Sequence, residues 1–310
     1  PELPEVQTIV DDLRAAGLEG RCFEAARVFW ARTIAEPSVK AFCSRIKGQM
    51  ITAIRRRGKF IVFALQNNAH LLMHLRMSGR LHLVAPDQPR QKHEHVLLTL
   101  SGTQQLRFHD TRKFGRLYLM PDAERILDRL GPEPLAKGFT SKKLTQLLKP
   151  RKRLLKPLLL DQAFIAGLGN IYVDEALWDS KIHPCRIAAA LSDFEIQALH
   201  RAIPRVLKRG LKNLGTSLGT GKTNFYSVAK HQGRNSDQLN FSGAPANPAR
   251  AVKQQSSESS SASAARNMSA VSKGLNILTA IKYCLQSISN RYLNQGFSVQ
   301  VSAHLNNPDT

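Results

Sequence analysis

The sequence is poor in cysteine and in acidic residues. Its 310 residues hold only four cysteines, Cys22, Cys43, Cys185 and Cys284, which lie far apart and form no CxxC pair. This spacing excludes a disulfide scaffold and a four-cysteine metal site, and it is typical of a reducing cytosol. We therefore expect a cytoplasmic protein without a bound metal.

Long apolar runs are absent as well. No stretch approaches the roughly 20 uncharged apolar residues that a membrane span needs. The chain also does not open with a basic segment followed by an apolar one, so we expect no secretory signal and no membrane partner. Hydrophobic residues nevertheless make up 42% of the sequence, which is enough for the cores of two domains of ordinary size.

The charge is strongly one-sided. Against 45 Lys and Arg stand 23 Asp and Glu, which gives a net charge of +22. Lys and Arg bind polyanions by releasing counterions from phosphates, so this excess favours a nucleic-acid partner over a basic protein with no special partner. Residues 241–310 carry six basic and two acidic residues, so +18 of the +22 lies in residues 1–240.

A helix is predicted over residues 3–16. Pro4 suits a first helical turn, and Glu2 and Glu5 suit the positive end of the helix dipole. Gly17 is a natural stop for the helix. Apolar side chains recur at helical spacing, at Val6, Ile9, Val10 and Leu13.

From about residue 20 to residue 120 the period changes to short β-rich runs separated by turn residues. The predicted strands are 50–56, 60–65, 71–75, 81–84, 96–100, 105–108 and 116–119. At least seven short strands at this spacing indicate a β-sandwich. We expect residues 1–131 to form this N-terminal domain.

The sequence Gly131-Pro132-Glu133-Pro134 breaks the pattern and indicates a linker. Helical segments follow at 141–148, 171–178 and 193–213, and the last opens with Ser192 and Glu195 at the spacing of a capping box. The fold class is therefore α+β, with a helical domain over 132–240.

The tail, residues 241–310, is a different kind of sequence. Residues 256–265 read SSESSSASAA, a low-complexity composition typical of disorder. A short amphipathic stretch follows at 278–288. We expect a divergent tail that is largely disordered, without strong packing on the body.

The first residues, Pro1 and Glu2, combine groups that support covalent chemistry. A free amine at Pro1 has an ordinary pKa of about 8, so part of it is neutral at pH 7. A neutral secondary amine attacks an aldehyde-like carbon and forms an iminium ion, with Glu2 available as an acid or base. The alternative from composition alone is that a proline-rich start is simply a helix entry.

The opening PELPEVQTIV resembles that of the formamidopyrimidine-DNA glycosylase family, and further segments agree in order across residues 1–240. These are RGKF at 57–60, HLRMSG at 74–79, KHEH at 92–95, DTRKFG at 110–115, DQ at 161–162 with GLGNIY at 167–172, and HP at 183–184. The resemblance implies a β-sandwich, a helix–two-turns–helix domain and a bifunctional repair enzyme for oxidised purines in double-stranded DNA. The expected form is a monomer.

The resemblance assigns roles to individual residues. Pro1 becomes the nucleophile that forms a Schiff base with the sugar C1′. Glu2 protonates the ribose ring oxygen, and Lys59 acts in the elimination steps near a phosphate. Met77, Arg112 and Phe114 enter the duplex where the damaged nucleotide leaves, because flipping a base costs a few kcal/mol of stacking. From the residues alone, ordinary packing in the sandwich is the preferred interpretation of Met77 and Phe114.

The same resemblance implies a set of DNA contacts. Those to phosphates are His93, Arg151, Lys156 and Asn170, and Arg112 is a further contact. The glycines around Leu168 let the backbone approach a phosphate closely, with a helix N-terminus behind it. Residues 215–233 align with the family's loop over the extruded base.

The resemblance ends at residue 241. The family's β-hairpin zinc finger has two CxxC pairs, and none follows Asn240 here, so the structural zinc is expected to be absent. We interpret the tail as a shifted reading frame or an unrelated fusion. Three functions stay open: an active purine-directed glycosylase and lyase, a DNA-binding relative without catalysis, and a pyrimidine-directed relative similar to endonuclease eight.

Overall fold

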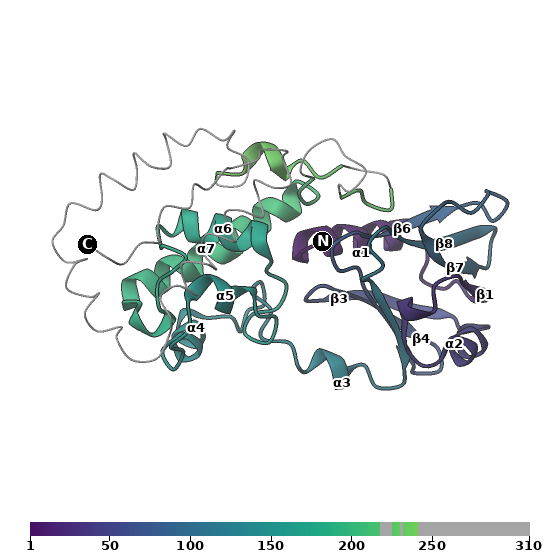
Figure 1. Cartoon of the computed structure of the whole chain (residues 1–310), viewed down its shortest axis with the longest axis horizontal. Coiled ribbons are helices and arrows are strands. Elements are labelled where there is room, and N and C mark those ends of the chain that lie inside the picture. Colours follow the sequence, from purple (N-terminus) through teal and green to yellow (C-terminus); the bar gives the residue numbers. More distant parts are fainter. Residues whose placement is uncertain (218–224, 230–231, 241–310) are drawn as a thin grey trace, which may run out of the picture. The chain divides into compact units, whose positions relative to one another are not determined.

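The computed structural model describes residues 1–217, 225–229 and 232–240, and these form an α+β fold, as predicted (Figure 1). The expectations for the tail, including the amphipathic stretch at 278–288, lie outside the described residues. The same holds for residues 218–224 and 230–231 of the segment aligned with the family's loop. Among the described residues, no helix combines the length and apolar character needed to cross a bilayer.

Helix α1 (Leu3–Ala15) agrees with the prediction to within one residue. Pro4 lies in its first turn, and Gly17 follows its end with a φ of +68°, a left-handed conformation that favours glycine. The apolar face is buried, and the helix contacts both β3 and α7. It is therefore shared between the sheets and the helical half of the molecule.

In the described part of the chain, nine strands form two sheets. The first sheet has the order β1-β7-β8-β6 and is antiparallel throughout. Its strands are β1 (Phe23–Val28), β6 (Gly79–Val84), β7 (Glu94–Leu100) and β8 (Gln104–Asp110). The second sheet has the order β2-β9-β5-β4-β3, and only the β2–β9 pair in it is parallel. Its strands are β2 (Ile34–Glu36), β3 (Ile51–Arg57), β4 (Phe60–Leu65), β5 (His70–His74) and β9 (Arg116–Met120).

One hydrophobic core unites the two sheets with α1. It includes side chains from both sheets, such as Phe63 of β4 and Phe108 of β8, and Leu13 of α1. Strands β1 and β2 and helix α2 (Val39–Ile46) were not predicted. In β1 only Phe23 is fully buried, so the strand lacks the alternation by which a strand is recognised.

The helical half begins after the short helix α3 (Glu124–Leu127). It comprises α4 (Ser141–Leu148), α5 (Leu155–Leu160), α6 (Asn170–Asp179) and α7 (Asp193–Lys212). Three short 3₁₀ turns complete the described elements, η1 (Ala31–Thr33), η2 (Ala188–Ala190) and η3 (Asn235–Gln238). The predicted capping box is confirmed, since the Ser192 hydroxyl accepts from the Glu195 N–H at 3.2 Å and Glu195 accepts from the Ser192 N–H at 2.8 Å.

The helical half has its own core, to which α1 contributes one residue. Leu3 is fully buried among side chains of α4, α5, α6 and α7. Its N–H donates to the carbonyl of Gly167 at 3.0 Å. The first residues of the chain are thereby fixed against the loop that precedes α6. The predicted domain boundary at residues 131 and 132 stays a prediction.

Candidate active site

The Glu2 carboxylate lies at the N-terminus of α6. The N–H of Gly169 donates to its Oε2 at 2.7 Å, the N–H of Ile171 to Oε1 at 2.9 Å, and the N–H of Tyr172 to Oε2 at 3.3 Å. The first N–H groups of a helix have no partner within it, and the helix dipole favours negative charge there. A residue at the start of the chain is therefore held by donors 167 or more positions away.

A second carboxylate, that of Glu5, is buried and supports this arrangement. Its Oε2 accepts from the Glu2 N–H at 2.8 Å, and its Oε1 accepts from the Tyr172 hydroxyl at 2.9 Å and the Thr216 N–H at 2.8 Å. Burial raises the pKa of Tyr172 well above its ordinary value of 10.0. Tyr172 therefore remains a neutral donor to Glu5 at physiological pH.

Two glycines leave room for Glu2 and Leu3. A Cβ on Gly169 would lie 2.5 Å from the Cδ of Glu2, and a Cβ on Gly167 would lie 2.9 Å from the Cβ of Leu3. Gly167 also has a φ of +92°, which side chains rarely adopt. The glycines predicted to allow close approach of a phosphate thus also allow close approach of the protein's own first residues.

Burial brings the pKa of the Pro1 amine and the pKa of the Glu2 carboxyl closer together. It lowers the pKa of the Pro1 amine below its ordinary 8.0, although the Glu5 and Glu2 carboxylates work in the opposite direction. It raises the pKa of Glu2 above 4.5, against the opposing influence of Lys59 and of the N–H donors of α6. The pair is suited to supplying a neutral amine and a protonated acid at once.

Lys59 belongs to the same electrostatic group. It lies in the tight turn between β3 and β4, and burial lowers the pKa of its ammonium, opposed by Glu2 and Glu5 and assisted by Arg76. Burial also lowers the pKa of His74 to about 3, with added repulsion from Arg76, Lys59 and the Pro1 amine. The structure thus brings together the three predicted catalytic residues, Pro1, Glu2 and Lys59, which we call the amine site.

Met77, Arg112 and Phe114 form a second group, which we call the exposed triplet. A guanidinium N–H of Arg112 donates to the Met77 sulfur at 3.1 Å, and the Arg112 Cζ lies 5.0 Å from the centre of the Phe114 ring. Met77 is 64% exposed and Phe114 is 49% exposed. The alternative of packing inside the sandwich is therefore wrong for these two side chains.

One buried carboxylate, Asp110, holds the two loops that carry the exposed triplet. Its Oδ2 accepts from the Gly115 N–H at 2.7 Å, and its Oδ1 accepts from the Arg112 N–H at 3.2 Å and from the Ser78 hydroxyl. Its carbonyl oxygen lies 2.8 Å from the Nε2 of His95. Asp110 is fully buried at the end of β8, so this anchor is rigid where the three side chains above it are open to solvent.

The remaining predicted DNA contacts lie in different settings. The ring of His93 packs against His95 and His109, at centroid distances of 6.3 and 5.8 Å. Arg151 follows α4 and is exposed, and Asn170 is exposed at the first position of α6, beside the N–H groups that bind Glu2. Lys156 makes an ion pair with buried Asp174, Nζ to Oδ1 at 2.8 Å.

Sequence reasoning missed the residues that hold these groups in place. Glu5 was considered only for its effect on the helix dipole, and Asp110 only as the first residue of the motif DTRKFG. Tyr172 and Thr216 were given no role. The sequence around Asp110, RFHDTRK, is polar and gives no sign that this carboxylate is buried.

The described residues offer no site for a metal. They contain no group of three or more His, Cys, Asp and Glu side chains that could hold one, and Cys22, Cys43 and Cys185 are free thiols. The fourth cysteine, Cys284, is a single donor, and a four-thiolate zinc site needs four. The donor set of this chain does not fit the structural zinc of the family that it resembles.

Comparisons with known proteins agree with this geometry over most of the chain. The family model of the formamidopyrimidine-DNA glycosylase N-terminal domain matches residues 1–117, and that of the formamidopyrimidine-DNA glycosylase H2TH domain matches residues 130–221. The formamidopyrimidine-DNA glycosylase of Protochlamydia amoebophila is 45% identical over 240 residues, which cover 77% of this chain and 87% of that protein.

Solved structures of similar proteins were determined with damaged DNA. The complex between the Lactococcus lactis Fpg and DNA containing an abasic site is similar with a TM-score of 0.70 and 33% identity, over 77% of this chain and 87% of that one. A point mutant of the Lactococcus lactis Fpg in complex with DNA containing Fapy-dG has the same TM-score, identity and coverage. The chain belongs to the formamidopyrimidine-DNA glycosylase family.

Proposed function

We propose that this chain removes oxidised purines from double-stranded DNA in base-excision repair and then cleaves the strand, with the Pro1 amine as nucleophile. The observation that carries the proposal is the amine site, where an amine of lowered pKa and a carboxyl of raised pKa lie together at the start of α6. The named activity of the relatives and the DNA in the similar structures support the same substrate.

The proposed first step is attack of the neutral Pro1 nitrogen on C1′ of the damaged nucleotide. The bond between C1′ and the base nitrogen breaks, and the base departs with the electron pair of that bond and takes up the proton that the Pro1 nitrogen loses. Glu2 donates its proton to the ribose ring oxygen, which opens the ring and leaves an iminium ion between Pro1 and C1′. A carboxyl with an ordinary pKa would hold no proton at pH 7, whereas burial favours the protonated form of Glu2.

Strand cleavage follows from the iminium ion as an electron sink. Loss of a proton from C2′ expels the 3′ phosphate by β-elimination, and a further elimination expels the 5′ phosphate. We propose that Lys59 acts in these steps, because its pKa is lowered by burial and its charge is coupled to Glu2. Water then hydrolyses the iminium ion, which releases the unsaturated sugar fragment and restores the Pro1 amine. The strand is left with a gap of a single nucleoside with phosphates on both sides.

Capture of the damaged base needs a replacement in the stack. We propose that Met77 and Phe114 fill the gap and that Arg112 binds the orphaned partner base. Their exposure and their preassembled contacts support this, since apolar wedges and guanidinium groups fulfil these roles in bent duplexes. We further propose that His93, Arg151, Lys156 and Asn170 contact the phosphates.

We also propose that the chain acts as a monomer without a structural zinc. The net charge of +22 supports binding to DNA in place of the missing finger. The zinc proposal predicts that elemental analysis of the purified protein gives no stoichiometric zinc and that a chelator leaves abasic-site cleavage unchanged. Stoichiometric zinc lost together with activity would contradict it.

Borohydride trapping tests the proposed activity. The protein, with its free Pro1 amine verified by mass spectrometry, is mixed with a duplex carrying 8-oxoguanine opposite cytosine and, separately, with one carrying an abasic site. We expect a covalent band on both. A band on the abasic duplex alone would show that base removal has failed, and no band from the folded protein would favour the DNA-binding relative without catalysis. A duplex with an oxidised pyrimidine distinguishes the endonuclease-eight-like alternative.

A further inference from the structure

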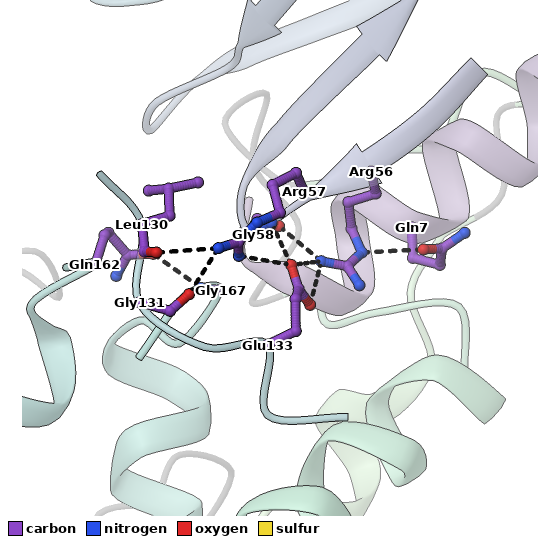
Figure 2. Close-up of polar contacts among 9 residues, drawn as sticks. All are labelled: Gln7, Arg56, Arg57, Gly58, Leu130, Gly131, Glu133, Gln162 and Gly167. Atoms are coloured by element: carbon purple, nitrogen blue, oxygen red, sulfur yellow. Dashed lines mark hydrogen bonds and ion pairs between the residues drawn. The ribbon is translucent and has the colours of Figure 1, made fainter. Parts of the chain in front are cut away.

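A compact polar cluster joins the turn that carries Lys59 to the segment after α3. Figure 2 shows this cluster around Glu133, which lies in the predicted linker and faces two arginines at the end of β3. Both Oε atoms of Glu133 lie 2.9 Å from one nitrogen of Arg56, and its Oε1 lies 3.3 Å from Arg57. The arginine and glutamate side chains are 11–22% exposed, so water screens them little.

Glu133 also binds the turn itself. Its Oε1 accepts the N–H of Gly58 at 2.6 Å, which is the residue directly before Lys59. Gly58 has a φ of +56°, and a Cβ on it would lie 3.3 Å from Leu130 and 3.4 Å from Ala166. The turn is therefore pressed against the linker and the loop before α6 while a carboxylate holds its backbone.

The arginines fix the other side of the cluster. Arg57 donates to the carbonyl oxygens of Leu130 at 3.0 Å and Gly131 at 2.8 Å. Arg56 donates to the Gly58 carbonyl at 3.1 Å and to the side chain of Gln7, on α1, at 3.0 Å (Figure 2). The N–H and the carbonyl of Gly58 are thus both held by charged groups.

Gln162 extends the cluster to the other members of the amine site. The N–H of Gly131 donates to the Gln162 carbonyl at 2.8 Å, and the N–H of Gly167 donates to the Gln162 side chain at 3.0 Å. The carbonyl of Gly167 in turn binds the N–H of Leu3. One chain of contacts therefore connects Glu133 with the backbone on which Pro1 and Glu2 lie and with the turn on which Lys59 lies.

We propose that Glu133 is a positioning residue for Lys59: it sets where the Lys59 amine lies relative to Pro1 and Glu2 by holding the Gly58 backbone against the linker. The inference rests on the proposed function, in which Lys59 takes part. In some proteins a largely buried ion pair specifies one arrangement more than it adds stability, and this one holds the turn that carries Lys59. Glu133 touches no reacting atom and acts only through geometry.

A double-mutant cycle tests the inference. The variants are Glu133→Ala, Lys59→Ala and both together, and the measurement is the single-turnover rate of cleavage at a preformed abasic site. A misplacement of about 1 Å costs up to roughly 100-fold in rate, so we expect Glu133→Ala to slow the wild-type protein by about 10- to 100-fold. In the Lys59→Ala background the same change is expected to have little effect, because the group that it positions is absent.

The matched control is Glu124→Ala. Glu124 makes an ion pair with Arg55, the neighbouring arginine on β3, but this pair is 3.5 Å long and half exposed. We expect Glu124→Ala to cleave the abasic site at the same rate as the wild-type protein. Glu133→Gln serves as the intermediate case, since an amide oxygen still accepts from Gly58 but no longer pairs with the arginines. Thermal melting shows whether each variant is folded.

Borohydride trapping provides a second readout, because it needs the Pro1 amine and not Lys59. We expect Glu133→Ala to retain trapping while cleavage falls, so that the ratio of trapped complex to cleaved product rises. An equal loss of trapping and cleavage, or the same fold-change in both backgrounds, would overturn the inference. If Glu133→Ala is unfolded, Glu133→Asp takes its place, since its shorter side chain keeps a negative charge near the arginines but draws its oxygens away from the Gly58 N–H. An inactive wild type would instead overturn the proposed function.

Discussion

The amine site and the exposed triplet are built in opposite ways. The amine site is half-buried, and its Glu2 carboxylate is bound by the backbone at the start of a helix that lies far along the sequence. The exposed triplet lies open to solvent and is anchored within the sheets by Asp110. The proposed covalent chemistry depends on pKa shifts that burial causes, whereas the proposed insertion into a duplex requires apolar surface that is free before DNA arrives.

The largest effect in this comparison is expected from Glu2→Gln. General acid and base catalysis contributes about 10²- to 10⁴-fold, so excision of 8-oxoguanine should slow by that amount while affinity for the duplex stays similar. Single-turnover excision and a binding titration measure the two quantities. Asp11→Asn, an exposed acid on the same helix, is the control. If Glu2→Gln excised 8-oxoguanine at the wild-type rate, Glu2 would not be the proton donor.

The pH dependence of the cleavage rate should follow from the shifted pKa values of Pro1 and Glu2. The neutral fraction of Pro1 rises with pH through a pKa below 8.0, and the protonated fraction of Glu2 falls with pH through a pKa above 4.5. Rates should therefore rise and then fall, with limbs of about tenfold per pH unit. The cleavage rate at an abasic site measures this. A falling limb that persists in Glu2→Gln would belong to another group.

A smaller effect, on capture and not on chemistry, is expected from the exposed triplet. Stacking of an aromatic ring on a base contributes about 1–3 kcal/mol, so Phe114→Ala should raise the Kd for a duplex with an abasic analogue by about tenfold. Phe29→Ala is the control, since both rings are 49% exposed and Phe29 stacks on Arg90. Equal losses in the two variants would mean that exposure alone explains the effect.

The smallest effect on DNA binding is expected from Asp110→Asn. An amide cannot accept from all the donors that the buried carboxylate binds, so the free energy of unfolding should fall by about 1–3 kcal/mol. Affinity should fall less than in Phe114→Ala, because the three side chains remain. Thermal melting and the same titration measure both, with exposed Asp122→Asn as control. Unchanged stability would show that the loops do not depend on Asp110.

The sequence predicted the elements with strong periodicity and little else. Helices α1, α4, α6 and α7 and seven strands lie close to their expected places, and the fold class is confirmed. Strand β1 and helix α5 were missed, since one buries a single side chain and the other is a six-residue segment with an internal proline. Hydrophobic periodicity predicts a helix or strand only where buried side chains recur regularly along it.

The candidate site was predicted in its reactive residues but not in their supports. Short motifs name Pro1, Glu2 and Lys59, yet the partners of Glu2 and Gly58 lie far along the chain, at α6 and in the linker. Glu133 was regarded as part of a break between domains. Contacts of this range have no signature in spacing, because they depend on how the two halves of the chain meet.

The bond between Glu2 and α6 also has a consequence for biosynthesis. The ribosome adds about 5–20 residues per second, so roughly 10–30 seconds separate the emergence of Glu2 from that of its partners at Gly169 and Ile171. During this interval the Glu2 carboxylate lacks the backbone donors that hold it in the folded protein. The geometry of the Glu2 carboxylate is therefore completed only after α6 has been synthesised and folded.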